Sequence, residues 1–455
     1  MTTVDATISE LRSRAPGAIH LPDDPDYETG RTTFYGGFDQ RPAAVVRPAN
    51  AAEVPGVVTT VAGSGTELAV RSGGHSLAGH SLSDGGIVLD LAAMKRLDID
   101  PQGRTAWAEA GLTAGEYTEA VGAHGLVTGF GDTGSVGIGG ITLAGGIGFL
   151  ARRNGMTIDD LLGAEIVTAD GSILHVDAEH HPDLFWAIRG GGGNFGVATR
   201  FHYRLHELPT VTGGLLILPA TPETVSGFLA AAAAAPDDVT TIANVMMAPP
   251  MPFLPEEVHG RLVLLGIICD AGPVAGAEAR LAPFRDVTEP LADMVRPITY
   301  PEMFFPEEPD FHPTAVGRTM FVDDIDAGSV DAILTRIVES DAPMRVAQLR
   351  VLGGAMARVP EDATAFAHRR RPYMASVAAF YTDPTEVPAR TQWVVDFASE
   401  LQRGEEAAYV GFLADEGEDR LRLAYPKPTW DRLVGVKRRY DPDNVFRRNH
   451  NIAPA

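Results

Sequence analysis

Cysteine is almost absent from this sequence, because Cys269 is the only one in 455 residues. A single cysteine excludes an intrachain disulfide, a cysteine-ligated zinc site and an iron–sulfur cluster. Cys269 lies in the apolar run LLGIICDAG, which predicts a small buried residue. The scarcity of cysteine fits a reducing compartment, and we expect a cytoplasmic protein.

Positive charge is also scarce, with 37 Lys and Arg against 60 Asp and Glu and a net charge of −23. A surface this acidic repels phosphate backbones, so nucleic acid is not an expected partner. The most apolar stretches, 213–218 and 228–235, are too short to span a bilayer. The N-terminus shows no basic segment followed by an apolar one, so we expect neither a secretory signal nor a membrane partner.

The pattern along the chain predicts an α+β or α/β protein in which three regions differ. Residues 1–208 alternate short β-like runs with helical segments. Residues 209–408 combine strand patterns with amphipathic helices, which predicts a sheet with helices on one face. The tail, 409–455, carries a helix over 429–440 that ends at a DPDN turn, because Pro442 cannot continue it. That turn lacks the glycine and glutamate of a calcium loop, so no metal site is expected.

Glycine is concentrated in three segments, at 71–75 (RSGGH), 129–155 and 189–197. Glycine pairs allow positive φ and close approach of the backbone, and successive free N–H groups suit a pyrophosphate. Segment 129–155 holds too many glycines for a stable helix, which favours a structured loop against a flat or charged ligand. His75 follows such a turn and could reach a bound cofactor, although a loop histidine with a structural hydrogen bond is the ordinary alternative.

Gly191, Gly193 and Gly196 satisfy the GxGxxG pattern of dinucleotide-binding proteins. That fingerprint requires a strand before it and a helix after it. Here DLFWAIRG, which looks helical, precedes the glycines, and VATRFHYRL, which alternates like a strand, follows them. We therefore reject a Rossmann site, and the missing Walker lysine pattern removes the simplest nucleotide hydrolase.

Five segments occur in the same order in one known family. The sequence resembles FAD-linked oxidoreductases of the berberine bridge enzyme type, within the vanillyl-alcohol oxidase and PCMH-type flavoproteins, over the first two hundred residues and the tail. The segments are RSGGH (71–75), GSVGIGGITLAGGIGFLARRNG (134–155), VTADGSI (167–173), DLFWAIRGGGGNFGVAT (183–199) and YDPDNVFRRNHNI (440–452).

The resemblance implies a two-domain PCMH-type FAD-binding fold. Residues 1–208 and 409–455 would form the FAD-binding domain, and 209–408 a substrate domain built on an antiparallel sheet covered by helices. In relatives the histidine of RSGGH is bonded to the flavin 8α-methyl, a role that falls on His75. Many relatives add a second bond through a cysteine at the position of Thr133, so this chain is expected to hold FAD through His75 alone.

Further cofactor contacts are expected around His75, in the other glycine-rich segments and on the tail. Asn449 and Asn451 alternate on a strand-like run, so both could face the flavin ring, with an ordinary turn hydrogen bond as the alternative. The expected contacts besides His75 are Arg71, Ser72, Gly73, Gly74, Ser76, Thr133, Ser135, Val136, Gly139, Gly140, Gly145, Ile166, Gly196, Val197, Asn449 and Asn451.

The expected chemistry is transfer of a hydride from a small alcohol, phenol or amine to flavin N5, and then of electrons to O2, giving H2O2. Relatives that use oxygen carry valine at the position of Val136, which favours an oxidase. The family's frequent Y-x-N-Y stretch reads here as Tyr409-Val410-Gly411-Phe412, and Ser376 stands where some relatives have Glu or Gln. Tyr409 and Tyr381 remain candidate bases, although a strand tyrosine more often packs than catalyses.

Methionine and phenylalanine gather at 246–253 and 303–305, which indicates either core packing or an adaptable apolar pocket. With no obvious base, an apolar pocket favours a hydrophobic or amine substrate. Two alternatives stay open: a monooxygenase-like enzyme that uses an oxygenated flavin, and a non-catalytic flavin- or ligand-binding protein. The sequence does not indicate an oligomeric state.

Overall fold

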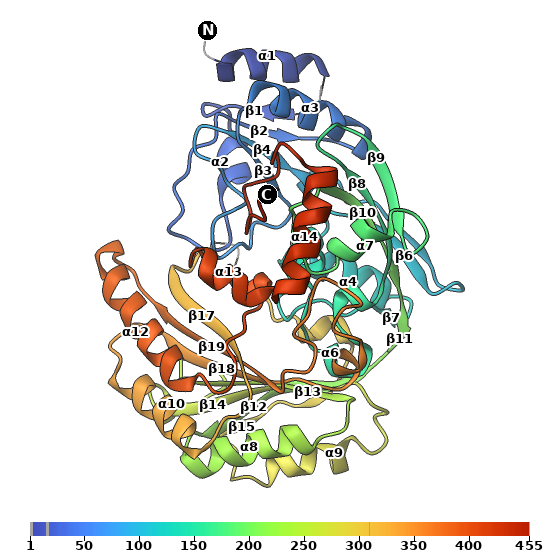
Figure 1. Ribbon diagram of the computed structural model, residues 1–455. Helices are drawn as coiled ribbons and strands as arrows, with labels where there is room; N and C mark the ends of the chain where they lie inside the picture. The colour runs from blue at the N-terminus through green and yellow to red at the C-terminus, as the bar shows by residue number, and fades with distance from the viewer. Residues whose placement is uncertain (1–2, 15–17, 309, 455) are drawn as a thin grey trace.

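The strands of the chain form four sheets in the computed structural model, which describes residues 3–14, 18–308 and 310–454. The first sheet has the order β1-β2-β4-β3, and β2, β3 and β4 run parallel. Helix α3 (Val54–Ser64) lays its valines on this sheet, and α1 (Thr3–Arg14) packs on α3 (Figure 1). The strands are β1 (Ala18–His20), β2 (Ala44–Arg47), β3 (Leu68–Arg71) and β4 (Ile87–Asp90).

A second, antiparallel sheet has the order β5-β6-β10-β8-β9. Helix α7 (Pro182–Ala187) precedes the GxGxxG glycines and β10 follows them, so the order predicted from the sequence is confirmed and a Rossmann turn is absent there. Helix α4 (Ala114–Gly122) starts at a Thr113 cap. The strands are β5 (Leu97–Asp100), β6 (Thr105–Glu109), β8 (Leu161–Val167), β9 (Ile173–Asp177) and β10 (Val197–Arg204), beside the pair β7 (Leu126–Val127) and β11 (His206–Glu207).

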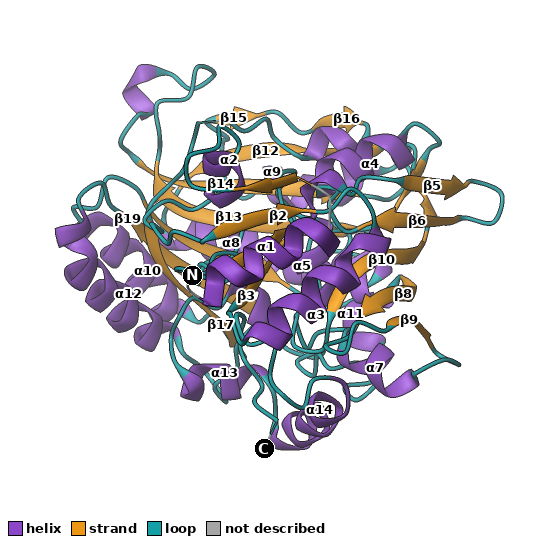
Figure 2. Ribbon diagram, turned by 90° about the horizontal axis from the view of Figure 1, so that it is seen from above, coloured by secondary structure: helices purple, strands orange, loops and turns teal. Residues whose placement is uncertain are grey.

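An eight-stranded antiparallel sheet fills the middle of the chain. Its outer face is covered by α8 (Pro222–Ala234), α9 (Ala277–Arg285), α10 (Ala327–Glu339) and α12 (Val387–Leu401), as Figures 1 and 2 show. This confirms the expected antiparallel sheet covered by helices. The strands are β12 (Val211–Pro219), β13 (Val239–Met247), β14 (Leu262–Asp270), β15 (Ala292–Asp293), β16 (Arg296–Ile298), β17 (Ala315–Val322), β18 (Arg345–Val351) and β19 (Tyr373–Phe380).

The tail returns to the first half of the chain. Helix α14 (Lys427–Tyr440) packs against α7, and its side chains join the core that the first two sheets share (Figure 1). Helix α13 (Glu418–Ala424) leads into it. We propose domain boundaries at 208/209 and 408/409, because the eight-stranded sheet and its covering helices fall between them.

The glycine-rich segment 129–155 is not a loop throughout, so that expectation was wrong. It contains α5 (Ile138–Ala144) and α6 (Ala151–Asn154). Ile138 and Thr142 are fully buried, and a Cβ on Gly139 would lie only 3.1 Å from the Ser72 side chain. Close packing therefore forms this helix in spite of the low helix propensity of glycine.

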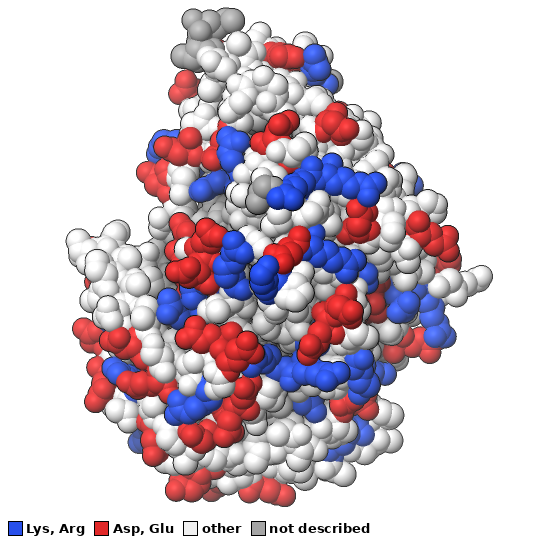
Figure 3. All heavy atoms as spheres, in the orientation of Figure 1, with Lys and Arg blue, Asp and Glu red and all other residues white. Residues whose placement is uncertain are grey.

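On one face of the molecule, charged side chains are not gathered by sign (Figure 3). Figure 3 shows acidic and basic side chains interspersed on the face that carries α13 and α14. Among the described helices, none is both long and apolar enough to cross a membrane.

Candidate functional site

A cavity of about 310 Å³ lies between the first half of the chain and the tail. Its wall comes from the loop after β3, from residues 131–147 around α5, from the glycines before β10, and from 409–413 and 446–450. The glycine-rich segments noted in the sequence thus meet around one space. The Met-rich segments do not line it, and Met303 is fully buried in a core cluster with Cys269.

His75 lies on the wall of the cavity, and two neighbours fix its ring. Phe34 stacks on the imidazole with centroids 4.2 Å apart and an interplanar angle of 15°. Ser135 Oγ lies 2.9 Å from His75 Nε2. Burial, together with the charge of Arg71, lowers the pKa of His75 to about 4. The ring is therefore neutral near pH 7 and keeps a free lone pair on one nitrogen.

The loop that carries His75 touches the segment before α5 backbone to backbone. A Cβ on Gly73 would lie 2.2 Å from the Gly137 nitrogen, and a Cβ on Gly137 would lie 2.2 Å from the Gly73 nitrogen. Gly74 adopts φ +71°, a conformation that favours glycine. Two glycines in contact bring both backbones to the cavity wall, where their N–H groups suit an anionic ligand.

Most of the expected cofactor contacts meet at this cavity. Those on its wall are Ser72, Gly73, Gly74, His75, Ser76, Thr133, Val136, Gly139, Gly140, Gly196, Val197 and Asn449. Those outside its lining are Arg71, Ser135, Gly145, Ile166 and Asn451.

Residues outside the lining support the segments that form the cavity wall. Arg71 donates to the carbonyls of Thr29, Gly30 and Thr32 at 2.6–2.9 Å, so its side chain fixes that segment. Gly145 ends α5 with φ +134°, and Ile166 is buried in the core from β8. Ser135 acts on the cavity through His75.

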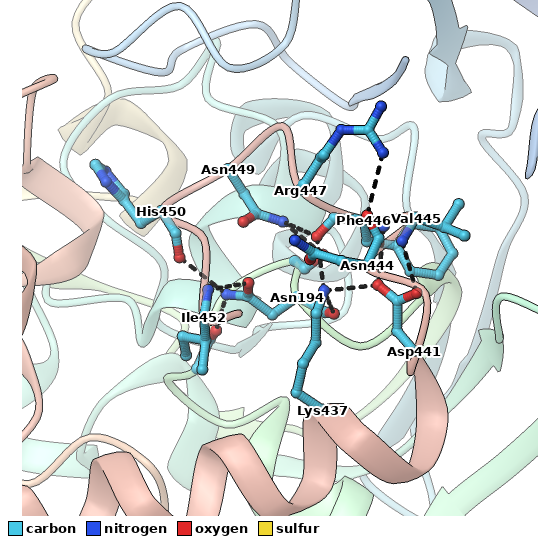
Figure 4. Close-up of polar contacts among 12 residues, drawn as sticks. Asn194, Lys437, Asp441, Asn444, Val445, Phe446, Arg447, Asn449, His450 and Ile452 are labelled. Atoms are coloured by element: carbon cyan, nitrogen blue, oxygen red, sulfur yellow. Dashed lines mark hydrogen bonds and ion pairs between the residues drawn. The ribbon is translucent and has the colours of Figure 1, made fainter. Parts of the chain in front are cut away.

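Residues 447–453 form no strand, so the strand-like alternation expected for the two asparagines was wrong. The Asn194 side chain, rather than a neighbouring strand, supplies hydrogen bonds to this backbone. It accepts from Ile452 N–H at 2.9 Å and donates to the His450 carbonyl at 3.1 Å (Figure 4). Asn449 donates to the Gly193 and Phe446 carbonyls, while its Oδ1 is buried without a hydrogen-bond partner. Asn449 thus offers an unpaired acceptor at the cavity wall.

A buried ion pair lies beneath this tail. Lys437 Nζ contacts Asp441 Oδ2 at 2.6 Å, and neither side chain is exposed. Lys437 also donates to the Asn194 and Phe446 carbonyls, while Asp441 accepts from the N–H groups of Val445 and Phe446 (Figure 4). The DPDN turn predicted from the sequence is confirmed, and its first aspartate anchors the tail. No cluster of metal-ligating side chains occurs among residues 3–14, 18–308 and 310–454.

The two candidate tyrosines differ in position. Tyr409 lines the cavity, and its hydroxyl accepts the Gly146 N–H at 2.8 Å. Burial raises the pKa of Tyr409 to about 12, which makes it a poor base near neutral pH. Tyr381 follows β19 beside Gly37 and lies outside the cavity lining, so the structure does not support a catalytic role for it.

Several residues of the wall escaped the sequence analysis. Asp132 lines the cavity and forms an ion pair with Arg350 of β18, which lies behind the lining. The sequence could have indicated Asp132, because it is a carboxylate within the glycine-rich segment 129–155. No local sequence pattern indicates a role for Arg350. The others are Tyr35, His80, His450 and Arg448.

Acid is expected to destabilise the protein through His80. Burial, and next the neighbouring His450 and Arg448, lower the pKa of His80 from 6.5 to about 3. Between pH 6.5 and about pH 3, His80 is protonated in the unfolded chain but not in the folded protein. The free energy of unfolding therefore falls as the pH falls through this window. At pH 5 the cost relative to pH 7 is about 2 kcal/mol. Urea unfolding at both pH values should show this loss shrink in His80→Asn and persist in the exposed control His124→Asn.

Two known sequence patterns match the chain. The pattern described as FAD binding domain matches residues 42–177, and the one described as Berberine and berberine like matches residues 408–453. With the mixed helix and sheet fold around the cavity, these matches define an FAD-dependent oxidoreductase. The chain carries the FAD-binding domain and the berberine-like segment found in FAD-linked oxidoreductases of the berberine bridge enzyme type.

Relatives of known name cover nearly the whole chain. An uncharacterized FAD-linked oxidoreductase, YgaK of Bacillus subtilis, is 29% identical over 97% of this chain and 98% of its own length. The (R)-6-hydroxynicotine oxidase of Paenarthrobacter nicotinovorans is 28% identical over 96% of this chain and 97% of its own. The crystal structure of 6-hydroxy-D-nicotine oxidase from Arthrobacter nicotinovorans superposes with a TM-score of 0.86 at 25% identity, covering 96% and 98% of the two chains.

Proposed function

We propose that this protein is an FAD-dependent oxidase that holds its flavin through one covalent bond, to His75. The observation that carries the proposal is the neutral imidazole of His75, fixed on the cavity wall by Phe34 and Ser135. A second bond through sulfur is excluded by the sequence, because Thr133 stands at that position and Cys269 is fully buried in β14.

The residues of the cavity fit FAD. The apposed backbones at Gly73 and Gly137 supply N–H groups for the pyrophosphate, and Asn449 Oδ1 is an unpaired acceptor for an N–H donor on the flavin ring. Bound FAD would supply the redox chemistry, accepting a hydride from the substrate and passing electrons to O2.

Ser135 Oγ is hydrogen-bonded to Nε2 of His75. In the tautomer that carries its hydrogen on Nε2, the lone pair that could bond the flavin is on Nδ1. The low pKa of His75 keeps that lone pair free near neutral pH. We therefore assign the covalent bond to Nδ1.

The proposed substrate class is supported by apolar side chains in the lining. Val136, Ile147 and Phe412 are among them, which favours a small alcohol, phenol or amine over a sugar. The names of relatives span both classes, from (R)-6-hydroxynicotine oxidase to a glucooligosaccharide oxidase of Sarocladium strictum. An FAD-dependent monooxygenase of Fusarium proliferatum, 39% identical over 42% of this chain, supports oxygenation as the second candidate.

A substrate panel tests the proposed function. (R)-6-hydroxynicotine, benzyl alcohol, benzylamine and xylobiose are each mixed with the purified holoenzyme, first without oxygen and then in air. We expect one of the apolar compounds to bleach the flavin and to release H2O2 in air. Bleaching by xylobiose alone would contradict the substrate class, reoxidation by a quinone but not by air would indicate a dehydrogenase, and a hydroxylated product would indicate a monooxygenase.

Val136→Leu is expected to slow reoxidation by air. Val136 lines the cavity, and one added methylene narrows the space through which O2 approaches the cofactor. We expect the rate of reoxidation to fall by about tenfold, equivalent to about 1.4 kcal/mol of activation free energy, with anaerobic reduction unchanged. Stopped-flow mixing of reduced enzyme with aerated buffer measures this. Ile147→Leu, which conserves volume at another lining position, is the control, and an equal slowing in both variants would contradict the prediction.

A further inference from the structure

Asp132 is the only carboxylate on the cavity wall among the described residues. It follows the glycines of segment 129–131, and its side chain is 20% exposed. One oxygen is held by Arg350, and the other accepts only a long contact of 3.4 Å from the Thr133 hydroxyl. The carboxylate therefore retains acceptor capacity toward the cavity.

Arg350 reaches Asp132 from the inner face of the eight-stranded sheet, and a chain of amides fixes it. Its Nε and Nη2 donate to Gln348 Oε1 at 3.0 and 2.7 Å. Gln348 Nε2 donates in turn to Asn244 Oδ1 at 3.0 Å, and Asn244 donates to the Leu265 carbonyl. The Arg350 side chain is 6% exposed. Charged hydrogen bonds of this kind fix an arginine in one geometry.

The surroundings of the pair leave it electrically neutral. Arg350 balances Asp132, while the other charged side chain of the described lining, Arg448, donates to the Leu82 carbonyl and lies 4.0 Å from Glu67. Phe412 lies under the Arg350 guanidinium at 5.5 Å and packs edge-on against Tyr409. A fixed neutral pair in an apolar wall disfavours a ligand of either charge, because an added ion must be desolvated without gaining a counter-ion.

We propose that Asp132 and Arg350 form the polar recognition group of the substrate site and select a neutral, apolar molecule with one hydroxyl or uncharged amine. Asp132 accepts the hydrogen bond from that O–H or N–H. The pair joins a loop of the first half of the chain to the sheet of the middle region. It would therefore bind the ligand at the junction of these two regions. The inference rests on the proposed function, because it takes the Asp132 end of this cavity as the part that faces the substrate when FAD occupies the rest.

Three probes of nearly equal shape and different charge test the proposal: benzamide, benzoate and benzamidinium. None has an oxidisable C–H beside its polar group, so titration calorimetry of the FAD-loaded enzyme reports binding without turnover. For the wild type we expect benzamide to bind at least about tenfold more tightly than either ion. If the wild type binds benzoate or benzamidinium as tightly as benzamide, or more tightly, the proposal is overturned. This part of the test requires no variant.

Two variants change the charge of the pair in opposite directions. Asp132→Asn leaves an arginine unpaired, so benzoate should tighten by about tenfold or more, with benzamidinium unimproved. Arg350→Gln leaves a carboxylate unpaired, so benzamidinium should tighten by a similar factor. Arg318→Met is the matched control, because it removes an arginine of the same sheet whose ion-pair partner, Glu416 at 2.8 Å, is outside the cavity lining, whereas the partner of Arg350 is Asp132 on the cavity wall.

The outcomes separate this inference from the proposed function. If neither charge variant alters ion preference, or if Arg318→Met alters it equally, the pair does not face the ligand and the proposal fails. If the preferences reverse as expected while no panel compound reduces the flavin, the recognition group stands and the oxidase proposal fails. Should one variant not fold, the other still gives a decisive shift.

Discussion

His75→Ala is expected to release all of its flavin on acid precipitation, whereas the wild-type precipitate stays yellow. Among the wall residues, His75 combines a neutral ring, fixed by Phe34 and Ser135, with a position on the glycine loop. Alanine leaves the backbone cradle at Gly73 and Gly137 in place, so FAD should still bind, but without a covalent bond. Absorbance of pellet and supernatant after precipitation measures the partition.

His80→Ala is the matched control, because His80 also lines the cavity and is also a neutral imidazole. Its flavin should remain with the protein. Ser135→Ala should retain a covalent flavin that forms more slowly, because the tautomer of His75 is no longer fixed. Flavin that stays in the His75→Ala pellet would mean that another residue carries the bond.

Asp441→Ala is expected to lower the free energy of unfolding by about 3–5 kcal/mol, because it leaves the buried Lys437 ammonium without its counter-ion. The same change removes the acceptor of the Val445 and Phe446 N–H groups. The tail that presents Asn449 to the cavity loses its anchor, so FAD should also be retained less well. Urea unfolding followed by fluorescence measures the first effect, and flavin content after dialysis the second.

Asp443→Ala gives the control, since Asp443 lies in the same turn but is exposed. It should change the free energy of unfolding by at most about 0.5 kcal/mol. A Lys437→Met, Asp441→Leu double variant should recover only part of the loss, because the two backbone N–H groups stay unpaired. Equal stabilities of Asp441→Ala and Asp443→Ala would contradict the anchoring role of the pair.

Local sequence patterns correctly predicted several elements of the fold. The alternation after Gly196 and the apolar run before it correctly predicted β10 and α7, and this order excluded a Rossmann site. The runs at 262–270 and 373–380 form strands β14 and β19 of one antiparallel sheet, as their strand patterns indicated. These features follow from hydrophobic periodicity, which a single sequence shows directly.

Contacts between distant segments were beyond the sequence. Asp132 and Arg350 are 218 positions apart, so no local pattern joins them. Helix α5 forms because Gly139 packs closely on Ser72, which overrides propensity. The tail at 447–453 looked like a strand, yet the side chain of Asn194 supplies its hydrogen bonds. In each case a tertiary partner decides the local structure.

The central claim is that one histidine, His75, carries the flavin. Mass spectrometry of the denatured wild-type protein, followed by proteolysis and peptide sequencing, tests it most directly. We expect a chain heavier by one FAD, with the added mass on the peptide that contains His75 and on that residue. A denatured chain of unmodified mass, or a flavin found on another residue, would contradict it.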